Sequence, residues 1–393
     1  MGTPHTPGSR PIYLDWNATT PPHPSVTRAM AGAMDEAWAN PASVHAPGRR
    51  ARALLDGARE AVAALIGFDA RDVVLTSGGT EANNMALAHP FAHGQSPGSL
   101  VVARIEHPSI VRAAERLADS GVVVEWAEPD RAGAVSVEQV LGAVARATAR
   151  APVRVVAVQA VNHETGVIQP IAAIAEAVHA RGALLHVDAV QAVGRLASDT
   201  WSGADSVSVA AHKIRGPKGV GALVVRSSVR LRPILFGGAQ ERGLRPGTQD
   251  PVACAGFAVA AERAATTPTR YADLAALRDL LAEGLGRLGE RHRQAPLQNG
   301  EGARAPHVLN LSWPGWSGAE LCAALDLEGV AVSSGSACSA GTAEPSPVLR
   351  AMLGEERALS AVRVSLGEDT TREDVLEACA RWERVLARAS SDR

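Results

Sequence analysis

The sequence predicts an α/β fold with a mostly parallel sheet, followed by a smaller α+β domain. Two observations lead to this prediction. From about residue 70 to 225, short runs of β-branched residues alternate with Ala-rich segments of helical periodicity, and strands separated by helices form parallel sheets. After about residue 265 the alternation stops, and a long helical segment precedes a few isolated strand-like runs.

The strands of the predicted sheet are short, almost continuously apolar runs, as expected where helices cover both faces. They are DVVLT (72–76), LVVAR (100–104), VVVEW (122–126), VRVVAV (153–158), ALLHVD (183–188), SVSVA (206–210) and GALVV (221–225). The segments between them have helical patterns, for example PSIVRAAERLADS and IAAIAEAVHARG. In such sheets ligands bind beyond the carboxyl ends of the strands, so candidate site residues are sought there.

The remaining segments define the expected domains. Residues 1–11 are interpreted as a disordered tail, 12–264 as a large domain with 12–40 contributing to the small one, and 265–393 as the small domain. Within the small domain we expect a long helix at 270–289, a strand-like run at 307–313, a helix at 318–329, a strand-like run at 330–334 and a last helix from about 371. Residues 40–65 read as a loop and a long helix that links the domains.

Composition excludes several classes of protein. The chain has 46% hydrophobic and 20% charged residues and a net charge of −2, which is typical of a soluble globular protein rather than a nucleic-acid-binding one. Its four cysteines show no CxxC or zinc-ligand spacing, and no apolar run of about 18 residues occurs. We therefore expect a cytoplasmic protein with no resident metal, no membrane contact and no direct nucleic-acid contact.

The motif TSGGTEANN (76–84) follows an apolar strand and begins a helix. Gly78 and Gly79 allow a tight turn, and Thr80 sits where free N–H groups favour an anion. A phosphate site is the functional interpretation. An ordinary glycine turn with a Thr cap is the alternative, and this motif taken alone favours it.

Two further strand ends carry charged side chains. Asp188 ends ALLHVD, where a buried carboxylate requires a cationic partner such as a protonated pyridine nitrogen; capping the next helix is an equally good interpretation. Lys213 follows the strand SVSVA one βα unit later. A lysine near such an aspartate is what pyridoxal phosphate (PLP) chemistry needs. Lys218 reads instead as a surface lysine.

Cys338 lies in a loop in which six of the seven residues 334–340 are Gly, Ser or Ala. A loop of small residues suits a nucleophile that moves between two positions. Cys254, Cys322 and Cys379 occur in apolar helical segments and are predicted to be core residues.

Taken together, these motifs resemble the cysteine desulfurase family. The pieces LDWNATTP (14–21), NPASVH, TSGGTEANN, EHPS, VNHETGVIQP, HVDAVQ, HKIRGPKG, GGAQERGLRPGT, SSGSAC and VRVSLG occur in the family's order, from about residue 12 to 370. The resemblance implies PLP fold type I, the aspartate-aminotransferase-like fold, in a homodimer with PLP as cofactor. The SSGSAC loop resembles the branch that serves iron–sulfur cluster assembly and nitrogenase.

The resemblance also implies roles for individual residues. Lys213 corresponds to the lysine that binds the cofactor, Asp188 to the partner of its ring nitrogen, His107 to the imidazole stacked on its ring, and Gln191 to a contact of the ring hydroxyl. Gly79, Thr80, Ala210, Ala211 and His212 correspond to the phosphate site, and Thr248 to a phosphate contact from the neighbouring subunit. Arg363 corresponds to the clamp for the substrate carboxylate, with Asn17 and Asn162 near it. Cys338 corresponds to the sulfur acceptor and to a transient iron–sulfur ligand.

Two positions depart from the family pattern. His163 stands where the family usually has a second Asn that faces the ring hydroxyl, and Ala210 stands where it usually has a Ser that contacts the phosphate. An imidazole can donate the same hydrogen bond but alters the local charge. Both changes bear on cofactor affinity rather than on the fold.

The resemblance implies conversion of L-cysteine to L-alanine, with the sulfur transferred to Cys338 as a persulfide. An acceptor protein would receive it for iron–sulfur clusters, thio-cofactors or tRNA thiolation. His107 is the candidate base for the Cys338 thiol. The alternatives are a selenocysteine lyase, a class-V aminotransferase, which would leave the Cys338 loop without a role, and a non-enzymatic sulfur-relay paralogue.

Overall fold

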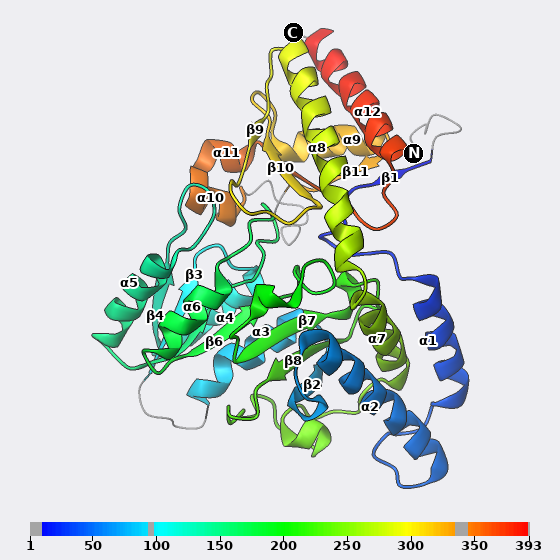
Figure 1. The fold of residues 1–393 in the computed structure, drawn as a ribbon, viewed down its shortest axis with the longest axis vertical. Helices are drawn as coiled ribbons and strands as arrows, with labels where there is room; N and C mark the ends of the chain where they lie inside the picture. Colours follow the sequence, from blue (N-terminus) through cyan, green and yellow to red (C-terminus); the bar gives the residue numbers. More distant parts are fainter. Residues whose placement is uncertain (1–9, 93–97, 335–344, 392–393) are drawn as a thin grey trace.

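The computed structural model describes residues 10–92, 98–334 and 345–391. Figure 1 shows a larger domain built on a sheet, and above it a smaller one that holds both ends of the chain. Most of the predicted N-terminal tail and Cys338 lie outside the described residues. No described helix is both long enough and apolar enough to cross a membrane.

The large domain contains a seven-stranded sheet in the order β2-β8-β7-β6-β5-β3-β4. All neighbouring strands are parallel except at β8, which is antiparallel to both β2 and β7. The mostly parallel sheet predicted from the sequence is therefore confirmed. Its strands are β2 (Val73–Thr76), β3 (Ser99–Ala103), β4 (Val123–Ala127), β5 (Val153–Ala157), β6 (Leu184–Asp188), β7 (Ser206–Ala210) and β8 (Gly221–Val225).

Helices cover both faces of this sheet. On one face, α3 (Gly79–Ala88) and α4 (Pro108–Asp119) pack on the strands through a core that includes Ala82, Ile110 and Leu223. On the other, α2, α5, α6 and α7 bury a larger core. These four helices are α2 (Ala46–Ile66), α5 (Val137–Thr148), α6 (Ile171–His179) and α7 (Pro251–Ala264). Burial of both faces explains why the strands read as continuous apolar runs.

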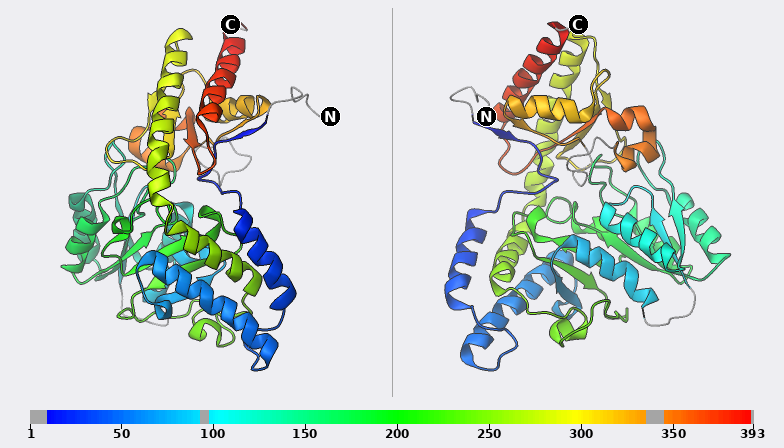
Figure 2. Two further views of the ribbon diagram at one scale, coloured as in Figure 1. Left: turned by 45° about the vertical axis from the view of Figure 1, so that its right-hand side comes forward. Right: turned by 180° about the vertical axis from the view of Figure 1, so that it is seen from behind.

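The small domain has its own core, in which the Trp313 and Trp382 rings lie 5.6 Å apart. Its strands form an antiparallel sheet β12-β10-β9 and a parallel pair β1-β11. The strands are β1 (Ile12–Tyr13), β9 (Leu297–Gln298), β10 (Val308–Ser312), β11 (Val330–Ala331) and β12 (Ala361–Ser365); the helices are α8 (Pro268–Arg291), α9 (Gly318–Leu327), α10 (Pro347–Leu353), α11 (Glu355–Leu359) and α12 (Arg372–Ser391). Figure 2 shows α8 and α12 side by side above the large domain.

The N-terminal segment differs in two ways from the predicted organisation. β1 pairs with β11 in the small domain, whereas α1 (Pro24–Glu36), which the sequence analysis did not predict, packs against α7 in the large domain. We expected residues 40–65 to link the domains. α2 instead packs along α7, and α8 passes between the domains. Among the residues of α1, only Val26 and Ala33 are buried.

Candidate active site

Asp188 and Lys213 follow the carboxyl ends of two paired parallel strands. β6 ends at Asp188, and β7 ends at Ala210 and continues into the turn Ala211–Lys213. Asp188 is 8% exposed, and its Oδ1 accepts the Val190 N–H at 3.0 Å. This contact lies in the turn 190–195 rather than at the start of a helix, so the structure does not show the helix cap of the alternative interpretation. In the described part of the chain no basic side chain forms an ion pair with Asp188 within 4.0 Å. A buried carboxylate without a cation fits a protonated ring nitrogen.

A buried network behind Asp188 fixes its orientation. Asn83 Nδ2 donates to Asp188 Oδ2 at 2.7 Å, while Asn83 Oδ1 lies 3.1 Å from His186 Nε2. The other ring nitrogen of His186 lies 2.9 Å from Ser206 Oγ. Burial lowers the pKa of His186 to about 3, so this ring stays neutral and donates one hydrogen bond. The Asn83 amide therefore has a defined orientation, with its N–H groups toward the carboxylate.

The Lys213 side chain is held by main-chain carbonyls. Its Nζ donates to the carbonyl oxygens of Asn17 and Ala18, the latter at 3.0 Å. Burial, together with the positive charges of Arg195 and Arg363, lowers the pKa of Lys213 to about 7. A lysine with this pKa is partly neutral near neutral pH and can act as a nucleophile or a base. Lys218 is exposed, as expected for a surface lysine.

The turn that begins α3 has the geometry of an anion site. Gly78 has a φ of 153°, and a Cβ on Gly79 would come within 2.9 Å of Val190 Cγ2. The backbone thus approaches the end of β6 more closely than other residues would allow. Thr80 is exposed in the first turn of α3, where helical N–H groups lack intrahelical acceptors. These features fit a phosphate group.

The residues after β7 border this turn. Ala210 and Ala211 are buried, and His212 Nδ1 lies 3.1 Å from Thr19 Oγ1. Burial, with the nearby charge of Lys213, lowers the pKa of His212 to about 4. A neutral His212 can offer one N–H donor. Thr248 is exposed in the loop before α7, and its expected contact with a second copy of the chain stays a prediction.

His107 and His163 form an edge-to-face pair, with ring centroids 5.2 Å apart and ring planes at 74°. His107 caps α4, and its Nδ1 accepts the Ser109 N–H at 3.1 Å. The lone pair on Nδ1 places the proton of the neutral ring on Nε2. Burial, Lys213 and Arg363 lower the pKa of His107. His107 is thus a neutral imidazole at the same edge of the sheet as Asp188 and Lys213.

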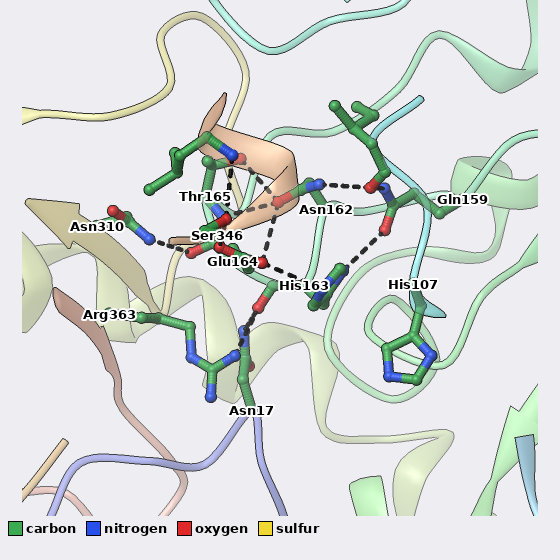
Figure 3. Close-up of polar contacts among 12 residues, drawn as sticks. Asn17, His107, Gln159, Asn162, His163, Glu164, Thr165, Asn310, Ser346 and Arg363 are labelled. Carbon is green, nitrogen blue, oxygen red and sulfur yellow. Dashed lines mark hydrogen bonds and ion pairs between the residues drawn. The ribbon is translucent and has the colours of Figure 1, made fainter. Parts of the chain in front are cut away.

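Both ring nitrogens of His163 face protein oxygens, as Figure 3 shows. Nδ1 lies 3.4 Å from Gln159 Oε1, and Nε2 lies 3.6 Å from Glu164 Oε1. Because the Gln159 amide N–H donates to the Ile105 carbonyl, its oxygen faces His163 as an acceptor. The geometry favours a proton on His163 Nδ1, and burial lowers the pKa of His163 well below its ordinary value. In this arrangement Nδ1 is the donor of His163, and Nε2 is an acceptor that is too far from Glu164 Oε1, at 3.6 Å, for a hydrogen bond.

Arg363 lies on β12 and reaches across from the small domain. It is 2% exposed; NH2 pairs with Asp15 Oδ1 at 2.7 Å, and NH1 donates to the His163 carbonyl at 3.1 Å. Its Nε is buried and has no hydrogen-bond partner among the described residues. A buried guanidinium with an unused donor is suited to bind a carboxylate.

Asn17, Gln191 and Asn162 are fully engaged inside the protein. Gln191 Nε2 donates to the Asn17 carbonyl at 3.0 Å, and Asn17 Nδ2 donates to the His163 carbonyl at 3.1 Å. Asn162 has no exposed surface: its amide N–H donates to Ile105, and its oxygen accepts the Glu164 and Thr165 N–H groups. Asn162 therefore shapes the loop that carries His163 rather than facing a ligand directly.

The described cysteines are unreactive. Cys254 is buried, while Cys322 and Cys379 pack against the small-domain core. Burial raises the pKa values of Cys254 and Cys322 to about 12 and that of Cys379 to about 11. Since the thiolate is the nucleophile, these three are poor candidates for sulfur transfer.

The sequence analysis missed several residues that support the site. Asn83 lies within TSGGTEANN, and Asp15 within LDWNATTP, so both motifs contained the signal. Glu164 lies next to His163, and its buried Oε2 accepts a hydrogen bond from Ser346 Oγ at 2.5 Å, at the start of α10. Arg195 lies four residues after Gln191, a helical spacing that places both on one side of a turn.

Comparison with known proteins identifies the family. The aminotransferase class-V family matches residues 12–377. A cysteine desulfurase of Bradyrhizobium diazoefficiens is 38% identical over 390 residues, which cover 98% of this chain and 96% of that protein. The cysteine desulfurase IscS of Escherichia coli is 39% identical over 377 residues, 93% of this chain and 90% of that protein. A solved NifS-like protein superimposes with a TM-score of 0.86 at 31% identity, covering 96% of this chain and all of the other. The chain belongs to the class-V aminotransferase family, in the branch of the cysteine desulfurases.

Proposed function

We propose that this protein is a PLP-dependent cysteine desulfurase that converts L-cysteine to L-alanine and transfers the sulfur to Cys338. The observation that carries the proposal is the meeting of three groups at one sheet edge. Lys213 has a pKa lowered to about 7. Among the described residues, Asp188 is a buried carboxylate with no basic side chain in an ion pair with it, and Arg363 has a buried Nε with no hydrogen-bond partner. They match a cofactor amine, a ring-nitrogen partner and a carboxylate clamp.

The same residues divide the chemistry between them. PLP supplies the electron-withdrawing ring that acidifies the substrate Cα. Asp188 keeps the ring nitrogen protonated, and the turn at Gly79 and Thr80 holds the phosphate. The Lys213 amine removes the Cα proton, and Arg363 fixes the substrate carboxylate.

Sulfur transfer then requires a thiolate at Cys338, which lies outside the described residues. The thiolate attacks the substrate sulfur: the C–S bond breaks, an S–S bond forms, and the carbon gains a proton to become the methyl group of alanine. His107 is the proposed acceptor of the Cys338 thiol proton, a role that requires its own ring proton on Nδ1, where Ser109 Oγ lies 2.8 Å away, rather than on Nε2. The persulfide passes to an acceptor protein for iron–sulfur clusters, thio-cofactors or tRNA thiolation. Cytoplasmic location and a homodimer, with Thr248 of each copy reaching the other site, complete the proposal.

The test is a sulfide and alanine assay on purified protein with L-cysteine and a reductant. We expect equal amounts of sulfide and alanine. The Cys338→Ser variant should lose sulfide release but keep the visible absorbance of bound cofactor, and Cys379→Ser is the matched control that should retain activity. Sulfide release by Cys338→Ser would contradict the proposal. So would transfer of the amino group from cysteine to an added keto acid without release of sulfide, because that is an aminotransferase reaction.

A further inference from the structure

Arg195 is a buried cation directly behind the Lys213 backbone. It is 1% exposed, and in the described part of the chain no carboxylate lies within 4.0 Å of its guanidinium nitrogens. Its polar neighbours are uncharged. It donates to the Asn17 side chain at 2.8 Å, to the Gln191 side chain, and to the carbonyls of Trp16 and Lys213, both at 3.2 Å, and its NH1 lies 3.2 Å from His307 Nε2. Its Nε has no partner among these residues.

Burying an unpaired charge is costly, and buried arginines usually have a carboxylate partner. Arg195 stays charged, because burial lowers its pKa from a very high ordinary value. Glu368 lines a narrow gap together with Arg195 and Tyr271. Its Oε2 lies 3.2 Å from Arg263 NH2 and 3.6 Å from Arg215 NH1. Its charge is therefore shared with two other arginines. The Tyr271 ring lies 5.8 Å from the Arg195 guanidinium carbon and adds a cation–π contact. The Tyr271 hydroxyl is a further uncharged hydrogen-bond partner of the Arg195 side chain.

The guanidinium is tied to Lys213 by two short connections. Arg195 NH2 donates to the Lys213 carbonyl, and NH1 donates to the Asn17 side chain. The Lys213 amine in turn donates to the backbone carbonyl of Asn17. The Arg195 guanidinium and the Lys213 amine thus both donate hydrogen bonds to Asn17. Both are buried, and repulsion between like charges is weakly screened in a buried environment.

We propose that Arg195 is a positioning residue for Lys213: a buried guanidinium, held only by uncharged acceptors, that keeps the Lys213 amine neutral and fixes the backbone that carries it. The inference rests on the proposed function, because it explains what makes the cofactor lysine reactive. Among the charges that act on Lys213, Arg195 is the strongest; Arg363 acts in the same direction, and Asp188 and Asp15 act against it. A neighbouring cation is an established means of activating an amine.

The sequence offers an unusually direct experiment. The chain contains only two lysines, Lys213 and Lys218. Reductive methylation of the full-length, cofactor-free protein with ¹³C-formaldehyde gives one NMR signal set for each, besides the N-terminal amine, and each can be titrated with pH. In the wild type we expect the Lys213 midpoint to lie about two pH units or more below the ordinary lysine value of 10.5.

Arg195→Gln removes the charge and should raise the Lys213 midpoint by about one pH unit or more. Arg195→Lys retains a cation and should keep the midpoint low; the third lysine signal set that it adds is identified by its absence from the wild-type spectrum. Arg263→Gln, which removes an arginine that is already paired with Glu368, is the matched control and should leave it unchanged. Circular dichroism checks that each variant is folded.

A wild-type Lys213 that titrates at the ordinary lysine value of 10.5 would overturn the proposal, as would an unchanged midpoint in Arg195→Gln. If Arg195→Gln does not fold, Arg195→Lys decides: a low midpoint supports the proposal and an ordinary one refutes it. This titration needs neither cofactor nor substrate. A protein that releases no sulfide from cysteine could still show the effect, so failure of this inference and failure of the proposed function are distinguishable.

Discussion

Replacing Lys213 by Met should change the pH dependence of stability in a calculable way. In the folded chain the pKa of Lys213 is about 7, whereas its ordinary value is 10.5. Between these values the unfolded chain binds more protons than the folded one, so the free energy of unfolding rises with pH. Below pH 7 the full free-energy cost of burying the protonated Lys213 amine lowers the stability of the folded chain. This cost disappears as pH rises past 10.5. Met has no such cost at any pH.

The size follows from the same two values. A difference of 10.5 − 7 corresponds to at most about 5 kcal/mol at low pH. By linkage, about 4 kcal/mol of this remains at pH 7 and about 1 kcal/mol at pH 10. The stability advantage of Lys213→Met over the wild type should therefore shrink by about 3 kcal/mol between these two pH values.

Urea unfolding of the cofactor-free protein, followed by tryptophan fluorescence at several pH values, measures this difference. Titration of tyrosines and cysteines occurs in both proteins and cancels. Lys218→Met, at an exposed position of the same loop, should show a constant difference from the wild type. If the wild-type and Lys213→Met stabilities run parallel from pH 7 to 10, Lys213 titrates normally and the assigned low pKa is wrong.

Three further substitutions test the site and its support. Arg363→Lys should lower kcat/KM for cysteine about 10- to 100-fold, mainly through KM, because an ammonium cannot reproduce the planar fork; an unchanged KM would remove Arg363 from the carboxylate site. Ser346→Ala loses both the cap of α10 and the hydrogen bond to Glu164, and should lower the free energy of urea unfolding by about 2 kcal/mol. Ser136→Ala loses only the cap of α5 and should cost about 1 kcal/mol. Equal costs would mean that the Glu164 contact contributes nothing. Gly367→Ala would place a Cβ 1.7 Å from Trp16 Cδ2 and should cost about 3 kcal/mol or more of stability. A Cβ on Gly32 would have no other atom within 4 Å, so Gly32→Ala should cost no stability. A stable Gly367→Ala would show that Trp16 moves aside freely.

The sheet could be predicted because each of its strands carries its own signal. Every predicted run from 72–76 to 221–225 overlaps a strand of the structure, since a strand buried on both faces must be apolar along its length. α1 was not predicted, and it buries only Val26 and Ala33. β1 and β9 have two residues each, too short for any pattern to identify, whereas β11 lies within the predicted run 330–334.

The candidate site could be predicted only in part, for a related reason. Asp188 and Lys213 follow recognisable strands, so their place at the sheet edge was predictable from topology alone. The resemblance supplied their roles. Their support was not predictable in this way, because Asn83, Arg195 and Glu164 act through contacts with residues distant in the sequence. Asn83 meets Asp188 across 105 positions, and no local pattern records such a contact.

Asn17 connects the two halves of the site. Its backbone N–H donates to Ser365 Oγ at 2.9 Å, on the same strand, β12, that carries Arg363. Residues 363 and 365 lie on one face of that strand, so the carboxylate clamp and the anchor of Asn17 move together. The Asn17 carbonyl holds the Lys213 amine, and its side chain accepts from Arg195. A displacement of β12 on substrate binding would thus act on Lys213 through a single residue, which couples the small domain to the amine of the large one.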